Sequence, residues 1–158
     1  MGISQQQLNT VVIALRASSD PVVVNALAHN NHVKLADWCN DNSATKAWMS
    51  AASRRDLFEA MNIATYDAVS AGKKDSWQMM MSVAPIDMAR AAMRKGILDI
   101  FVTADANTML AALTEWASNA ELLLGGNSAT SGTVTALKRN WAGEIDAKEL
   151  KQAFIESQ

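Results

Sequence analysis

The chain of 158 residues has only one cysteine, no long apolar run and a net charge of only −2. Because Cys39 has no second cysteine to pair with, an internal disulfide is excluded, which is typical of proteins from a reducing compartment. The apolar runs are far shorter than the roughly 20 residues needed to cross a bilayer. The polar start of the sequence lacks the form of a signal peptide. We therefore expect no membrane partner.

Residues that break helices are also scarce, with two prolines and seven glycines. Alanine, methionine and leucine, which favour helix, are plentiful. β-branched residues form clusters such as Val22–Val24 but do not alternate over strand-length runs. At 49% hydrophobic residues, the chain is too apolar to be disordered. The composition predicts an all-α fold, a compact bundle of about seven to nine short helices.

Local signals mark where several helices begin. Ser4 followed by Gln7 has the form of a capping box, in which each residue bonds the backbone of the other. Asp20-Pro21 combines a preferred N-cap with a proline at the first helical position. Further helices are expected at 32–40 and, around Trp48, at 45–52. Ser53 is expected to cap the next.

Two apolar stripes at helical spacing predict the centre of the bundle. They run over Ile86–Phe101 and Met109–Leu124, and we expect them to form an antiparallel helix hairpin. The polar stretch Asn127–Gly132 is the one candidate boundary. It divides a helical core, 1–126, from a polar loop and C-terminal helical hairpin, 127–158, which we expect to pack on the same domain.

The five tryptophans are spread one to a segment, each with apolar neighbours at helical spacing. Aromatic side chains of this size dominate the packing of protein interiors. We expect all five to be buried in one core: Trp38, Trp48, Trp77, Trp116 and Trp141.

Two patterns have a partial likeness to binding motifs. Lys34–Trp38 followed by Ser43–Met49 has the form of a helix-turn-helix with a reading helix. The reading helix offers only Lys46, and a net charge of −2 gives no reason to expect nucleic acid. Gly143–Leu150 resembles the second half of a calcium-binding EF-hand, but Lys138 would occupy the first ligand position and repel the ion.

No catalytic arrangement is visible in the sequence. His29 and His32 are three residues apart, but Asn30-Asn31 is expected to break the helix between them, and two ligands make a weak metal site. Neither histidine has an identifiable serine or cysteine partner for nucleophilic catalysis. We therefore expect no enzyme activity, no metal or other cofactor and no small-molecule substrate.

Charge and methionine content point instead to contacts with proteins. Lys73 to Lys95 holds five basic and two acidic residues, and Asp99 to Gly126 holds four acidic and no basic ones. Consecutive methionines at 79–81 cannot all face one core, because helical neighbours point about 100° apart. Flexible methionines suit adaptable interfaces. The candidate interface residues are Met79, Met80, Met81, Lys73, Lys74, Arg90, Arg94, Glu115 and Glu121.

The spacing of several residues resembles small helical proteins of tailed bacteriophages. The resemblance lies in the pattern Tyr66–Val69, Gly72–Lys74, Trp77, Met80 and Gly96–Phe101, and in the opening from Leu15-Arg16 through Asp20-Pro21 to Trp38–Asn40. It implies a structural or assembly role at the head, the head–tail junction or the tail of a virion. It carries no catalytic residues.

The sequence thus predicts a non-enzymatic virion or virion-assembly protein that acts through protein–protein packing. Its expected partners are other virion proteins or copies of itself, and its expected location is the virion, after synthesis in the host cytoplasm. The alternative is a small helical regulator that binds DNA through the segment 33–51 or binds a host protein.

Overall fold

The computed structural model describes residues 2–158, and within them the chain forms ten helices and four strands. Two compact units are present. Unit 1 consists of residues 2–45, 116–126 and 139–158, and unit 2 of residues 46–115 and 127–138. The chain passes from one unit to the other four times, and each passage falls inside a strand.

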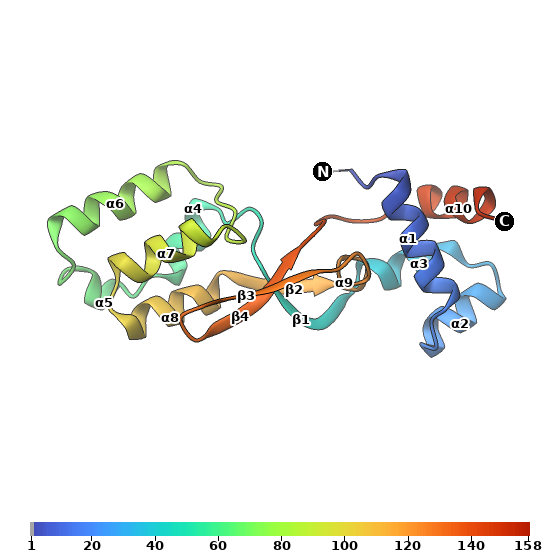
Figure 1. The fold of residues 1–158 in the computed structure, drawn as a ribbon, viewed down its shortest axis with the longest axis horizontal. Helices are drawn as coiled ribbons and strands as arrows, with labels where there is room; N and C mark the ends of the chain where they lie inside the picture. The colour runs from blue at the N-terminus through green and yellow to red at the C-terminus, as the bar shows by residue number, and fades with distance from the viewer. Residues whose placement is uncertain (1) are drawn as a thin grey trace. The chain divides into compact units, whose positions relative to one another are not determined.

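Unit 1 is helical and is built on strong local signals. α1 (Gln5–Arg16) begins with the capping box predicted for Ser4 and Gln7, and α2 (Pro21–Ala28) begins with Asp20 accepting from Val22 N. α3 (His32–Asn40), α9 (Asn119–Leu123) and α10 (Ala147–Glu156) complete the unit. Figure 1 shows α1, α3 and α10 side by side. Their apolar faces form one core that includes Leu8, Val11, Val12, Leu15, Leu35, Cys39, Trp141, Leu150 and Phe154.

Unit 2 has a second, separate core. Its helices are α4 (Arg54–Ala60), α5 (Ile63–Tyr66), α6 (Ala71–Ser82), α7 (Ala91–Ile100) and α8 (Thr103–Ala112). Helices α6, α7 and α8 pack in that order (Figure 1). The core they enclose includes Trp48, Leu57, Trp77, Met88, Ile97, Phe101, Met109, Leu110 and Leu113.

The four strands form one sheet with the order β2-β1-β4-β3. They are β1 (Asn42–Trp48), β2 (Thr114–Ser118), β3 (Gly126–Ser131) and β4 (Val134–Arg139). β1 runs parallel to β4 with Ala47 opposite Leu137. Only two residues join β3 to β4, which fits an antiparallel hairpin. The sheet is therefore mixed.

A glycine is required in the turn of this hairpin. Gly132 has a φ of +57°, in the left-handed region that glycine enters without steric cost. A Cβ at this position would also overlap Oδ1 of Asn107, which accepts a hydrogen bond from Thr133 N at 3.0 Å. The close approach of α8 to the turn therefore depends on the missing side chain.

The all-α prediction is wrong, because four segments form a sheet. The first half of the helix expected at 45–52 is the end of strand β1, and the second half forms no helix. Along β1, exposed and half-buried residues alternate from Asn42 to Lys46 before Ala47 and Trp48 are buried. The segment Ser43–Met49 is therefore no reading helix, and the helix-turn-helix prediction fails with it. Pairing with β4 outweighs a local sequence that has little strand propensity.

The predicted central hairpin, Ile86–Phe101 with Met109–Leu124, is also wrong. α7 begins only at Ala91, and Ile86 instead forms an antiparallel bridge with Ala52, through backbone hydrogen bonds of 2.8 and 2.9 Å. The second stripe is divided into the end of α8, strand β2 and the short helix α9. Likewise, most of the predicted loop Asn127–Gly132 is strand β3.

The single tryptophan core is wrong as well. Trp48 and Trp77 are buried in unit 2, and Trp141 is buried in unit 1. Trp38 is partly buried, whereas Trp116 on strand β2 is 48% exposed. Three of the five rings are thus buried, but they lie in two cores. Of these three, only Trp77 is on a helix, so helical spacing of apolar neighbours does not explain the burial of Trp48 or Trp141.

Candidate interaction surface

Helix α6 carries five of the nine candidate interface residues. It begins after Ser70, whose side chain accepts from Lys73 N, and its one fully buried residue is Trp77. The ring of Trp77 packs edge-on against Phe101, with 5.0 Å between the ring centres. This contact fixes the side of α6 that faces the core and therefore the side that is left to solvent.

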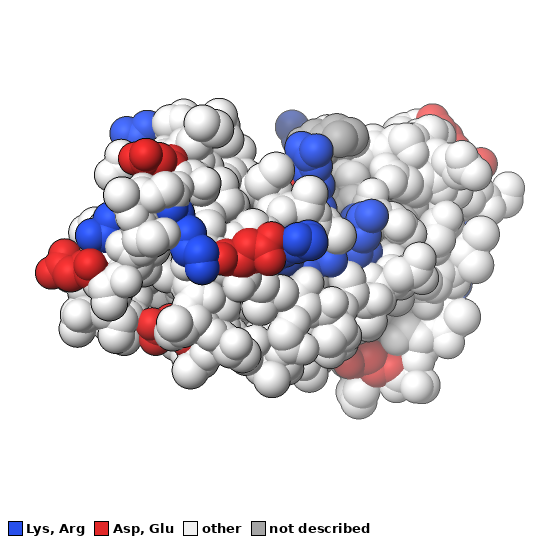
Figure 2. Space-filling model, turned by 60° about the vertical axis from the view of Figure 1, so that its left-hand side comes forward, with Lys and Arg blue, Asp and Glu red and all other residues white. Residues whose placement is uncertain are grey.

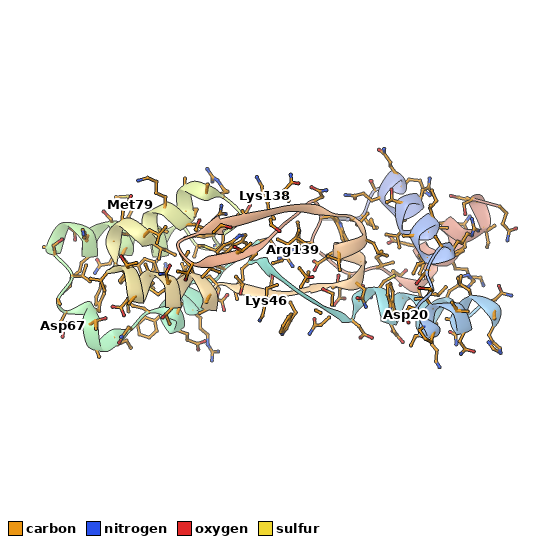
Figure 3. The ribbon with its side chains drawn as sticks, turned by 60° about the horizontal axis from the view of Figure 1, so that its bottom comes forward. Asp20, Lys46, Asp67, Met79, Lys138 and Arg139 are labelled. Carbon is orange, nitrogen blue, oxygen red and sulfur yellow. The ribbon has the colours of Figure 1, made fainter. Side chains whose placement is uncertain are left out.

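The three methionines divide as their helical spacing requires. Met80 and Met81 are partly buried against the core of unit 2, whereas Met79 is 69% exposed. Figure 3 shows the Met79 side chain pointing away from the unit. The Sδ atom of Met80 lies 3.1 Å from where a Cβ on Gly96 would stand, so this glycine allows α6 and α7 to approach closely.

Met79 has an apolar neighbour on the same face of the helix. Val83, four residues on, caps the end of α6 and is 63% exposed. Residues four apart on a helix lie one above the other. We call this pair, Met79 and Val83, the α6 face. It leaves two large apolar side chains exposed to solvent.

A cavity of about 440 Å³ opens in the same unit. It is lined by the turn that follows α5, the start of α6 and the junction of α7 and α8. Apolar side chains from Val69, Phe101 and Val102 meet Lys73 and Asp105 there. Asp105 is held by hydrogen bonds from Thr65 Oγ1 at 2.6 Å and from Asn62 Nδ2 at 3.5 Å. The cavity thus has apolar walls and one charge of each sign.

The two lysines of α6 lie in different surroundings. Lys73 is exposed and lines the cavity. Lys74 is half-buried: its Nζ donates to the carbonyl of Asp67 at 3.3 Å and lies 5.2 Å from the centre of the Tyr66 ring. Arg90 is exposed at the N-cap of α7, where its side chain makes no capping hydrogen bond.

Arg94 is buried, with 4% of its surface exposed. Its Nη1 donates to the carbonyls of Met88 at 2.8 Å and Ala89 at 2.7 Å, and its Nε donates to Ser131 Oγ at 2.8 Å. The guanidinium also lies over the Trp48 ring, 4.9 Å from its centre. Burial lowers the pKa of Arg94, and the negative charge of Asp87 partly offsets this. Arg94 therefore holds the interior of unit 2 together.

Glu121 is also buried, in unit 1. It closes the capping box of α9 with Ser118, and its Oε1 lies 3.1 Å from Arg139 Nη1 in a pair whose side chains are 7% and 6% exposed. Its Oε2 accepts from Gly143 N at 3.1 Å. Glu115 is exposed on strand β2 in unit 2. The structure thus groups the candidates of α6 but places Arg94 and Glu121 in two interiors.

The other motifs have structural roles. An EF-hand needs a helix directly before its calcium loop, but Lys138 and Arg139 belong to strand β4, so the element before Gly143–Leu150 is a strand. His29 caps the end of α2 and His32 begins α3, so the helix break predicted between them is confirmed. Within residues 2–158, no three His, Cys, Asp or Glu side chains are placed to hold a metal ion.

Cys39 lies in the core of unit 1 with none of its surface exposed. Burial raises the pKa of its thiol to about 12. Only the thiolate is an effective nucleophile, so the thiol is inert at neutral pH. Cys39 is therefore an apolar packing residue of this core.

Sequence reasoning missed Val102 and Asp105 of the cavity. Val102 follows a break between two helices and is 68% exposed, so neither periodicity nor a motif marks it. Asp105 accepts a hydrogen bond from Thr65, which lies 40 residues away in the sequence, so no local pattern marks it. On the face drawn in Figure 2, lysines and arginines lie among aspartates and glutamates, and most of the remaining surface is uncharged.

Among the described residues, no single helix is long and apolar enough to cross a membrane; α1 and α2 reach that length and composition only as a pair bent by 100°. No protein family, no curated protein and no solved structure matches the chain.

Proposed function

We propose that the protein is a non-enzymatic assembly component of a tailed-phage virion that works by protein–protein packing, with the α6 face as a contact surface. The observation that carries this is the exposure of Met79 at 69% and Val83 at 63%, side by side on one helix. Large apolar side chains grouped on a surface are typical of interaction sites. Met79 can also adapt its shape to a partner.

Two further features support a contact on unit 2. The cavity lined by Val69, Phe101 and Val102 is shaped to receive an apolar side chain, and Lys73 and Asp105 at its wall can orient polar groups around it. One of the two stretches on which the phage resemblance rests, Tyr66 to Phe101, belongs to this same unit, and the other, Leu15 to Asn40, belongs to unit 1. Partners are therefore other virion proteins or further copies of the chain.

The test is a charge placed on the α6 face. We expect the unaltered protein to sediment as a defined oligomer or to co-purify with virions, where mass spectrometry detects it. Met79→Glu, and separately Val83→Glu, should shift the protein to smaller species or remove it from particles, because a carboxylate would lose its hydration in the contact.

The matched control is Ile13→Glu on α1. Ile13 is 68% exposed, as Met79 is, but it lies in unit 1. It should leave assembly unchanged. Equal loss with Met79→Glu and Ile13→Glu would show a general effect of charge on association. A strictly monomeric protein that is absent from virions would overturn the proposal.

A further inference from the structure

A second cavity, of about 400 Å³, lies in unit 1 and is lined by basic side chains. The turn between α2 and α3 supplies His29 and His32, and the first two turns of α10 supply Lys148 and Lys151. Lys148 and Lys151 are three residues apart, so they lie on one side of α10. No aspartate or glutamate is among the residues that line the cavity.

The acidic groups of this region are gathered in a separate cavity. A pocket of about 380 Å³ is lined by Asp37, Glu144 and Asp146. Val33 and Ala147 line both cavities and therefore stand between them. Glu149 follows Lys148 on α10 but lines neither cavity. The lining of the basic cavity thus carries basic and no acidic side chains, although the chain as a whole has a net charge of −2.

The two histidines of this cavity make defined contacts. His29 Nδ1 lies 2.9 Å from the carbonyl of Asn25, and since a carbonyl only accepts, Nδ1 carries the proton. Nε2 is then the nitrogen that can turn to a ligand, and it donates when the ring is protonated. The His32 ring packs edge-on against Phe154, with 5.4 Å between the ring centres. Each ring is thus restrained by one contact.

Backbone groups also contribute positive electrostatic potential at the cavity. α3 and α10 both begin at the cavity, and the N-terminus of a helix carries a partial positive charge. The Asn31 side chain caps Lys34 N at 3.1 Å. Asp146, in the N-cap position of α10, accepts no capping hydrogen bond with its side chain. The first N–H groups of α10 are therefore not covered by this carboxylate.

We propose that this cavity binds the phosphate group of a small organic phosphate monoester. A phosphate monoester carries about −1.5 to −2 charges near neutral pH and three strong acceptor oxygens, which matches donors that converge from two helices. The cavity is larger than phosphate alone requires and falls in the range of about 300–1,000 Å³ typical of ligand sites. Val33, 61% exposed at its wall, offers an apolar contact for the organic part.

The test is a titration of the full chain with phenyl phosphate at constant ionic strength. Binding is measured from the shifts of backbone amide signals in two-dimensional NMR spectra. We expect saturable shifts confined to residues 29–33 and 147–151. Inorganic phosphate should shift the same amides with lower affinity, and acetate should bind more weakly still. The proposal is overturned if acetate matches phenyl phosphate, or if the shifted amides lie elsewhere.

Charge-neutral variants then separate a built site from general attraction. The double variant Lys148→Gln, Lys151→Gln should weaken phenyl phosphate binding by about tenfold or more, because each lysine supplies a charge-assisted hydrogen bond. The control is Lys34→Gln, an exposed lysine of the same unit that does not line the cavity. It should change the affinity less than about twofold, because Lys34 does not line the cavity and an exposed charge is screened by salt.

Equal weakening by Lys34→Gln and by the double variant would overturn the proposal. So would tighter binding of a short oligonucleotide, because that would indicate a surface for polyanions. A fold check on each variant uses the spectrum without ligand. Phosphate binding is tested independently of the proposed assembly function, because the α6 face lies in unit 2 and the basic cavity lies in unit 1.

Discussion

Units 1 and 2 each bury one charged network, but they balance its charge in different ways. In unit 1, Glu121 bonds to Arg139, so a carboxylate and a guanidinium are buried together. In unit 2, Arg94 donates to two backbone carbonyls and a serine hydroxyl and lies on the Trp48 ring. Both arrangements give hydrogen-bond partners to a buried charged group, the Glu121 carboxylate or the Arg94 guanidinium, which would be costly to bury alone.

The difference shows what each network does. The carboxylate of Glu121 joins the start of α9, the end of β4 and Gly143. Arg94 joins the segment before α7 to β3 and, through the ring, to β1. Each charge therefore holds together segments that are distant in sequence. An interface that used either residue would first have to open the core of its unit.

The largest expected effect comes from Glu121→Gln. A glutamine can still close the capping box with Ser118, so the change chiefly removes the negative charge beside Arg139. Breaking one partner of a buried ion pair costs about 3–5 kcal/mol, and we expect a loss of this size in the free energy of unfolding, measured by urea denaturation. Glu144→Gln, at an exposed carboxylate of the same unit, is the control. Equal effects would mean that the buried pair adds no stability.

Arg94→Met should cost somewhat less, about 3 kcal/mol, because the carbonyls of Met88 and Ala89 lose a charged donor but no opposite charge is stranded. Methionine retains an apolar stem over Trp48. Arg90→Met is the control, since Arg90 is exposed.

Hydrogen exchange of backbone amides should accelerate in unit 2 for Arg94→Met and in unit 1 for Glu121→Gln. The reverse distribution would contradict the assignment of one network to each unit.

Helix starts were the part of the fold that could be predicted, because a cap is a local interaction. The predicted box of Ser4 and Gln7, the Asp20-Pro21 start and the Ser53 cap are all present. Each depends on residues no more than three apart. The buried positions of α10, Leu150, Ala153 and Phe154, also follow the short-range spacing of a helix.

The strands could not be predicted because their signal is not local. β3 is built from Gly126–Ser131, a stretch of small and polar residues that has the composition of a loop. β2 lies inside an apolar stripe at helical spacing. Both segments form strands because they pair with other segments of the chain. The two networks were missed for the same reason, since Arg94 reaches Ser131, 37 residues away. Of the candidate surface, only the exposure of one methionine followed from helical geometry.

The glycine of the β3–β4 turn gives a third, smaller effect in unit 2. Gly132→Ala forces a side chain into the left-handed region and into Asn107, so Thr133 N would lose its acceptor. We expect a loss of about 2 kcal/mol, from backbone strain and the lost hydrogen bond together. Gly72→Ala is the control: a Cβ there meets no atom within 4 Å, and α6 should gain up to about 1 kcal/mol. A loss at both positions would remove the steric explanation.

The smallest effects should be nearly equal in the two units. The capping boxes at the starts of α1 and α4 have the same geometry, with Ser4 Oγ 3.1 Å from Gln7 N and Ser53 Oγ 3.0 Å from Asp56 N. Both serines are exposed. Ser4→Ala and Ser53→Ala should therefore each cost about 1 kcal/mol in urea denaturation. If one cost as much as Glu121→Gln, the exposed cap would be coupled to its core, and the contrast between local caps and buried networks would fail in that unit.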